Sequence, residues 1–90
     1  MKIRRNISFR VIKQLTKPVA IIYDEEKRQY LIIQGVWALA FDDIFCKRKS
    51  KETVLGSIRK KYPDIPLSII NRDFEVFLRE MQTLKIVEEE

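Results

Sequence analysis

Residues 29–45, QYLIIQGVWALAFDDIF, contain a change of hydrophobic period at Gly35. Before it, Leu31 and Ile33 alternate with Tyr30 and Ile32, and alternate side chains of a strand point to opposite faces. After Gly35, apolar residues recur at helical spacing, which predicts a largely buried helix from Val36 to Phe45. The period therefore predicts a strand over 28–34 that leads directly into an apolar helix.

Two further strands are predicted upstream of this stretch. Residues 7–14 alternate apolar and polar side chains, which is typical of a half-buried strand. Pro18 interrupts this pattern, and Val19–Tyr23 forms a second apolar run. The polar residues Asp24–Lys27 separate this run from the third strand, so a hairpin is expected.

Two more helices are predicted downstream. Ser50 is a suitable N-cap for a helix that Pro63 ends. A last amphipathic helix begins between Ser68 and Asn71 and closes at Ile86-Val87. The residues expected to form the core lie on the inner stripes of the three helices: Trp37, Phe41, Leu55, Ile58, Phe74 and Leu78.

The predicted fold class is α+β and winged-helix-like, with an N-terminal three-stranded antiparallel sheet followed by three helices. Ninety residues are enough for one hydrophobic core, so we expect a single domain over 1–90. We expect flexible ends at 1–6 and 88–90, since acidic residues oppose the dipole at a helix C-terminus.

The composition argues against an enzyme and against a metal centre. The chain has no histidine, which removes the commonest general base and the commonest metal ligand. It also lacks a phosphate-binding loop and a dinucleotide fingerprint. We therefore expect no catalysis, no metal and no cofactor. The single cysteine, Cys46, is expected to fill a buried position, although Lys47 and Arg48 beside it could lower its pKa.

Charge and cysteine content bound the location and the partners. The net charge of +5 is spread along the chain, which suits solvated surface or attraction for an acidic partner. One cysteine excludes an internal disulfide and fits a reducing compartment. No apolar run is long enough to span a bilayer, so we expect a cytoplasmic protein without a membrane partner.

The third strand carries the clearest signal of binding. Tyr30 and Ile32 lie on its non-core face, beside the basic residue Arg28. An exposed apolar strand is a template for another strand. A peptide that adds to such an edge gains main-chain hydrogen bonds, and pockets read its alternate side chains.

The last helix carries Asp73-Phe74, Phe77-Leu78, Met81 and Ile86 after the strand-to-helix change at Gly35. With these blocks, residues 18–87 resemble the family of pyrroloquinoline quinone biosynthesis D-type (PqqD-like) proteins, also called RiPP recognition elements, where RiPP denotes a ribosomally made, post-translationally modified peptide. The last block of the family pattern, Asp-Val-x-x-Phe-Leu-x-x-Leu-x-x-x-Gly-Leu, is matched by Asp73-Phe74, Phe77-Leu78, Met81 and Ile86, with Lys85 in place of Gly. In the preceding blocks, Ile33-Gln34, Val36-Trp37 and Ala40-Phe41 stand where the family has Leu-Asn, Thr-Ala and Ile-Trp, so Gln34 replaces Asn. The start of the next helix is matched by Ser50 and Val54, and a common Tyr by Tyr62. An Asp-Gly pair that follows the first helix in the family is absent.

The resemblance implies a non-catalytic peptide chaperone. Such a protein binds the leader segment of a precursor peptide and presents it to a modifying enzyme, which is a radical-SAM enzyme, a cyclase or a leader protease. The leader pairs with the third strand and lies against the third helix, and nearby basic residues would favour an acidic leader. The implied peptide-binding residues come from these two elements: Arg28, Gln29, Tyr30, Leu31, Ile32, Ile33, Arg72, Asp73, Val76, Phe77 and Glu80.

Two alternatives stay open from the residues themselves. A winged-helix DNA-binding protein would suit the basic charge, but Asp73, Glu75 and Glu80 would then face phosphates, and all strands precede the helices. Nucleic acid is therefore the less favoured partner. A structural subunit that pairs its exposed strand with an identical copy, giving a homodimer, is the other alternative.

Overall fold

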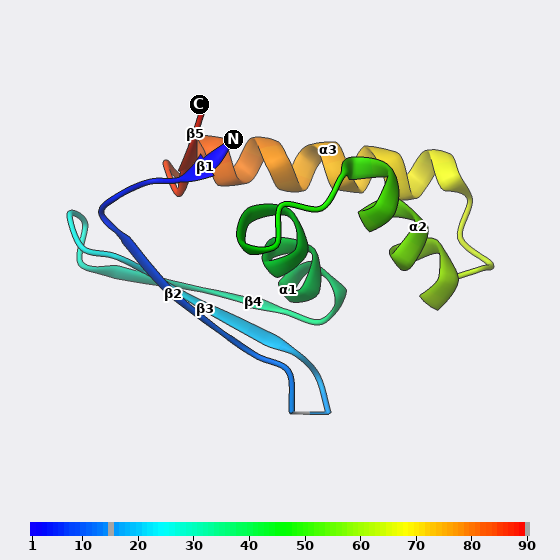
Figure 1. The fold of residues 1–90 in the computed structure, drawn as a ribbon, viewed down its shortest axis with the longest axis horizontal. Helices are drawn as coiled ribbons and strands as arrows, with labels where there is room; N and C mark the ends of the chain where they lie inside the picture. Colours follow the sequence, from blue (N-terminus) through cyan, green and yellow to red (C-terminus); the bar gives the residue numbers. More distant parts are fainter. Residues whose placement is uncertain (15, 90) are drawn as a thin grey trace.

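The computed structural model describes residues 1–14 and 16–89, and it has the predicted order of strands followed by helices, with one further short strand after the last helix (Figure 1). A three-stranded antiparallel sheet follows the short first strand. The elements in chain order are β1 (Lys2–Ile3), β2 (Ile7–Ile12), β3 (Val19–Asp24), β4 (Gln29–Gln34), α1 (Val36–Phe41), the π-helical turn η1 (Asp42–Cys46), α2 (Lys51–Lys61), α3 (Leu67–Thr83) and β5 (Val87–Glu88). The predicted fold class is confirmed.

The register of the sheet separates an inner face from an outer face. Ala20 pairs with Ile33 and Ile22 pairs with Leu31, so these four side chains point toward the helices. Ala20 and Ile22 in the central strand are almost fully buried. The alternation predicted for the third strand is confirmed, although Arg28 lies in the turn before β4, with a φ of 54°.

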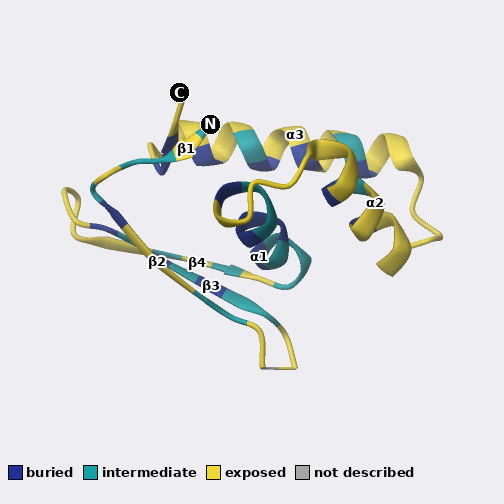
Figure 2. Ribbon diagram, viewed as in Figure 1, coloured by how far each residue is buried: buried dark blue, intermediate teal, exposed yellow. Residues whose placement is uncertain are grey.

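The core lies between the sheet and α3, where α1 occupies the middle of the molecule (Figures 1 and 2). The side of α3 that faces α1 is buried, and its opposite side is exposed. Phe41, Ile58 and Phe74 are buried as predicted. Trp37, Leu55 and Leu78 pack against the core but are only partly buried.

Ser50 caps α2 as predicted, since its side-chain oxygen accepts a hydrogen bond from the backbone N–H of Thr53. The last helix differs from the prediction at its end. It stops at Thr83, and the N–H groups of Lys85 and Ile86 then donate to the carbonyls of Gln82 and Met81. This is the Schellman arrangement, which ends helices where the chain enters the left-handed region, and Lys85 has a φ of 59°.

Two short strands lie in or beside the end segments 1–6 and 88–90, for which flexibility is predicted, and Glu90 is outside the described residues. Lys2–Ile3 and Val87–Glu88 form a two-stranded antiparallel sheet, and the N–H of Arg4 donates to the carbonyl of Ile86 at 3.0 Å. Ile86 and Val87 are buried. Burial of these apolar side chains, together with the β1–β5 pairing, holds both termini against the C-terminal end of α3 (Figure 1).

The π-helical turn after α1 places a carboxylate among cations. The buried Asp42 lies 2.6 Å from the Lys13 Nζ and 3.6 Å from the Lys47 Nζ, measured at its Oδ2. Burial alone would raise the pKa of Asp42, but the hydrogen bond and charge of Lys13 and the charge of Lys47 bring it below its usual value.

Cys46 differs from the two sequence-based expectations, which are a buried side chain and a lowered pKa. Its residue is exposed rather than buried, and the pKa of its thiol is raised to about 11 by partial desolvation and by the charge of Asp42. Desolvation and the carboxylate together outweigh the charges of Lys13 and Lys47, so the thiol is protonated at neutral pH.

Within residues 1–14 and 16–89, no helix combines the length and the apolar character needed to cross a membrane. The same part of the chain brings together no group of three or more His, Cys, Asp or Glu side chains suited to a metal ion.

Candidate functional site

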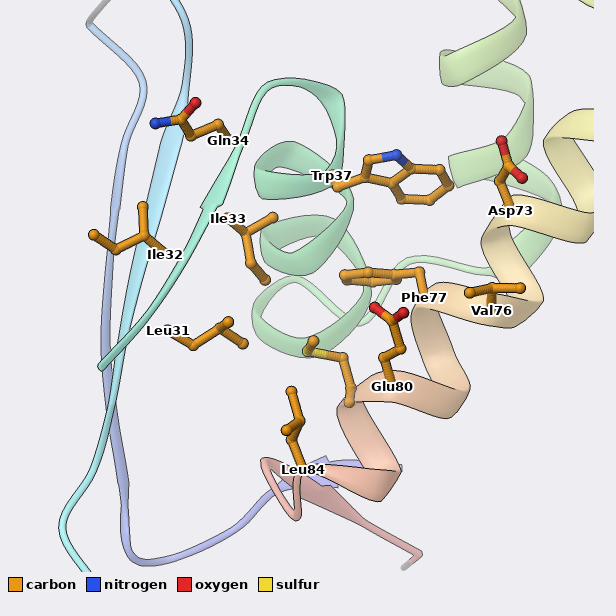
Figure 3. Close-up of a pocket in the computed structure, with 11 residues that line it drawn as sticks. Leu31, Ile32, Ile33, Gln34, Trp37, Asp73, Val76, Phe77, Glu80 and Leu84 are labelled. Carbon is orange, nitrogen blue, oxygen red and sulfur yellow. The ribbon is translucent and has the colours of Figure 1, made fainter. Parts of the chain in front are cut away.

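A groove of about 460 Å³ runs between β4 and α3 (Figure 3). Its floor and walls come from one strand and two helices. The lining residues are Leu31, Ile32, Ile33 and Gln34 from β4, Trp37 from α1, and Asp73, Val76, Phe77, Glu80, Met81 and Leu84 from α3 and its end.

The apolar interior of this groove follows from the periods of its elements. Leu31 and Ile33 point inward because they share the inner face of the sheet (Figure 3). Trp37 lies in α1, and its indole ring stacks on the Phe77 ring of α3, with ring centroids 5.2 Å apart and an angle of 28° between the ring planes. Phe77 and Met81 lie four residues apart on one face of α3 and are buried.

One side of the groove is an open strand edge. Among the described residues β4 pairs only with β3. The N–H of Gly35 donates to the carbonyl of Pro18 at 2.8 Å, so these two residues are a hydrogen-bonded pair of the antiparallel β3–β4 ladder. Hydrogen-bonded and non-hydrogen-bonded pairs alternate along such a ladder, so this bond shows which residues of β4 face β3. Leu31 and Ile33 therefore direct their main-chain groups toward β3, while Tyr30, Ile32 and Gln34 direct theirs outward. We call these outward N–H and C=O groups of Tyr30, Ile32 and Gln34 the open edge.

The side chains of Tyr30 and Ile32 do not point into the groove. They are 70% and 57% exposed, and Figure 3 shows Ile32 pointing away from the helices. Tyr30 instead packs on Tyr23 on the outer face of the sheet, with ring centroids 4.6 Å apart. On the groove side of β4, Tyr30 and Ile32 therefore present only their main-chain N–H and C=O groups.

The structure brings together most of the residues predicted for the site. Those that line the groove are Leu31, Ile32, Ile33, Asp73, Val76, Phe77 and Glu80. Gln29 and Tyr30 line a smaller hollow of about 110 Å³, which shares Leu31 and Leu84 with the groove. Arg28 and Arg72 line neither, and Arg72 forms an exposed ion pair with Asp73 at 3.8 Å.

Four lining residues were missing from the predicted site: Gln34, Trp37, Met81 and Leu84. Trp37 and Met81 have the helical spacing of core residues, and that spacing cannot separate a core from a groove floor. Leu84 could have been found, because it continues the stripe of Phe77 and Met81 by three residues and is 41% exposed.

The turn before β4 is fixed by Asp24. Its Oδ1 accepts hydrogen bonds from the N–H groups of Glu26 and Lys27 and from the side-chain amide of Asn6, at 3.0 to 3.1 Å. These bonds, led by that of Lys27, lower the pKa of Asp24 below its usual value. The turn thus sets where β4, and with it the open edge, begins.

A solved structure of similar architecture is TbiB1 in complex with the TbiA(beta) leader peptide. The TM-score is 0.80 at 18% sequence identity, over 100% of this chain and 98% of that chain. The chain has the fold of TbiB1. At 18% sequence identity, this similarity is evidence for a shared fold alone. No protein-family profile matches the chain, and no curated protein matches it by sequence.

Proposed function

We propose that this chain is a non-catalytic peptide chaperone that binds the leader segment of a ribosomally synthesised precursor peptide and presents it to a modifying enzyme. The observation that carries the proposal is the open edge of β4 beside an apolar groove. A leader segment adds to this edge as a fourth strand of the sheet, and its alternate side chains enter the groove.

Each part of the groove has a role in this proposal. The main-chain groups of Tyr30, Ile32 and Gln34 pair with the leader and are indifferent to its sequence. Leu31, Ile33, Trp37, Phe77 and Met81 supply the apolar floor, and Val76 extends it along the exposed side of α3. Gln29 contacts the leader where it passes the smaller hollow. Arg28 and Arg72 would act from outside the groove.

Two likenesses support the proposal. TbiB1, which has the same fold, was solved with a leader peptide bound. The motifs of residues 18–87 resemble the PqqD-like family, and Lys85 occupies the position of the family glycine with a φ that favours glycine. The modifying enzyme, by the same resemblance, is a radical-SAM enzyme, a cyclase or a leader protease.

Titration with the leader of a precursor peptide encoded beside this chain tests the proposal, followed by amide NMR shifts. We expect the largest shifts at 29–34 and 73–84, with affinity in the micromolar range or tighter. The substitution Ile32→Pro removes an outward N–H without breaking the β3–β4 ladder, so binding should fall at least tenfold while the fold is retained.

The matched control is Val11→Pro, which removes an outward N–H from the opposite edge of the same sheet, in β2. Val11→Pro should leave leader affinity within about twofold of the unmodified chain. Shifts confined to Lys2–Arg10 or Lys47–Lys51, or equal loss of binding in both variants, would contradict the proposed site.

A further inference from the structure

The charges that line the groove are acidic, although the chain as a whole is basic. The charged side chains in the lining are Asp73 and Glu80, both on α3, while the formal net charge of the chain is +5. The expectation of basic residues favouring an acidic leader is not met inside the groove itself. The local charge and the overall charge therefore favour opposite ligands.

Two cations, Lys27 and Arg72, contact residues of the groove lining. The Nζ of Lys27 donates to the carbonyl of Leu84 at 3.2 Å and lines the smaller hollow. Arg72 reaches Asp73 at 3.8 Å, but both side chains are more than half exposed, so this pair is weak. No ion pair occupies Glu80 within the part of the chain that the structure describes.

The helix itself adds to the negative potential. The wall of the groove runs along α3 from Asp73 to the end of the helix at Thr83. The C-terminal end of a helix carries a partial negative charge of about half an elementary charge. Glu80 lies in the last turn of α3, where no basic side chain compensates it. A cation in the groove would thus meet both a carboxylate and the helix dipole.

An aromatic ring completes the environment at the other end. Figure 3 shows the indole of Trp37 extending from α1 toward the turn of α3 that carries Asp73. One face of the Trp37 ring stacks on Phe77, so a cation drawn to the Asp73 carboxylate at this end would meet the other face. Contact with a ring face strengthens the binding of Lys or Arg side chains.

We propose that the groove selects an extended apolar segment with Lys or Arg on the side that enters it, so that the cations pair with Asp73 and Glu80. This inference rests on the proposed function and names the leader chemistry that the same site prefers. Asp73 and Glu80 are seven residues apart, about 10.5 Å along a helix. Groove-facing residues of an added strand recur about every 6.7 Å, so cations two or four positions apart reach both carboxylates.

Four synthetic nine-residue peptides test this selection. All share apolar first, fifth and ninth residues, which set the register, and threonine elsewhere. The first peptide has Lys at its third and seventh positions, which face the groove. The second has Gln there and the third has Glu there. The fourth has Gln there and Lys at its fourth and eighth positions, so that it carries the charge of the first on the opposite face.

The readout is the fluorescence of Trp37, which is the single tryptophan of the chain and lies in the groove. Amide shifts of 29–34 confirm where each peptide binds. We expect the first peptide to bind about fivefold to tenfold more tightly than the second and fourth, and the third to bind most weakly. Net charge acting at long range would give the reverse order, with the Glu peptide tightest.

Charge reversal in the protein supplies the second arm. In Glu80→Lys the preference should invert, so that the Glu peptide gains about fivefold and the Lys peptide loses a similar factor. The matched control is Glu52→Gln on α2, which removes an acid outside the groove lining and should leave the order of the four peptides unchanged.

The outcomes separate this inference from the function on which it rests. If none of the four peptides, nor the encoded leader, shifts the amides of 29–34, the peptide-binding function fails. If peptides bind there but the Gln or Glu peptide equals or exceeds the Lys peptide, the function stands and the cationic preference is wrong. Equal affinity for the first and fourth peptides would also overturn it.

Discussion

At the scale of single residues, Lys85 connects the sequence pattern to the fold. It stands where the family pattern has Gly, and its φ of 59° lies in the left-handed region that costs non-glycine residues about 1 kcal/mol. The structure keeps Lys in this conformation because two hydrogen bonds of the Schellman arrangement and the buried pair Met81 and Ile86 fix the chain there.

Substituting Lys85→Gly should therefore stabilise the protein by about 0.5–1 kcal/mol, because glycine adopts this φ without a Cβ clash. Thermal unfolding should show a rise in Tm. The control is Lys85→Ala, which removes the same charge but keeps the Cβ, and which should leave Tm nearly unchanged. A rise of equal size in both variants would assign the effect to charge rather than to backbone conformation.

At the scale of elements, the pairing of β1 with β5 joins the two ends of the chain beside the C-terminal end of α3 (Figure 1). β5 follows directly from the turn that carries Leu84 and Lys85, so its position helps to hold the end of α3. The side chains around the β1–β5 pairing are of two kinds. Ile3 and Val87 are apolar, whereas Lys2, Arg4 and Glu88 form exposed ion pairs of 3.8–3.9 Å.

Removal of residues 1–5 should lower the free energy of unfolding by about 1–3 kcal/mol, since it uncovers Ile86 and Val87. Urea denaturation measures the loss, and amide exchange at Val87 should become fast. The control Glu88→Gln removes the ion pairs alone and should cost under about 1 kcal/mol. An unchanged denaturation midpoint, with the Val87 amide still protected from exchange, would show that the β1–β5 pairing contributes nothing to stability.

At the scale of the whole molecule, Asp42 joins distant parts of the chain. It lies in the π-helical turn, and its partners Lys13 and Lys47 come from the β2–β3 connection and from the end of η1. Because its pKa is lower in the folded chain than its usual 3.8, its ionised form favours folding above that pH. This contribution is lost as the pH falls through the folded pKa. Asp24 acts in the same direction.

The variant Asp42→Asn should accordingly be less stable than the unmodified chain at pH 7, and the gap should narrow as the pH falls below about 4. Urea denaturation at several pH values from 7 to 3 measures it. Asp64→Asn, in the loop between α2 and α3, is the control for loss of a carboxylate and should change stability little at pH 7. A gap for Asp42→Asn that stays constant down to pH 3 would refute the assigned role.

The sequence by itself determined the order and type of the main elements. The change of period at Gly35, the Ser50 cap and the stripe of Phe74, Phe77 and Met81 depend on local spacing, which a sequence displays directly. The same spacing indicated the exposed third strand as a binding edge, whereas the last helix entered the predicted site through the family resemblance. The spacing also assigned Leu31 and Ile33 to the inner face, because a strand alternates without exception along a regular run.

Tertiary structure alone decided how those walls meet. Trp37 serves as groove floor because the sheet and α3 diverge around it, and helical spacing is the same for floor and core. The β1–β5 pairing depends on contact between residues more than eighty positions apart, Lys2 and Glu88. The acidic lining emerged because folding turns Lys27 toward a carbonyl and leaves Asp73 and Glu80 beside the open edge. The net charge can be counted from the sequence, but the positions of the charged side chains relative to the groove depend on the folded structure.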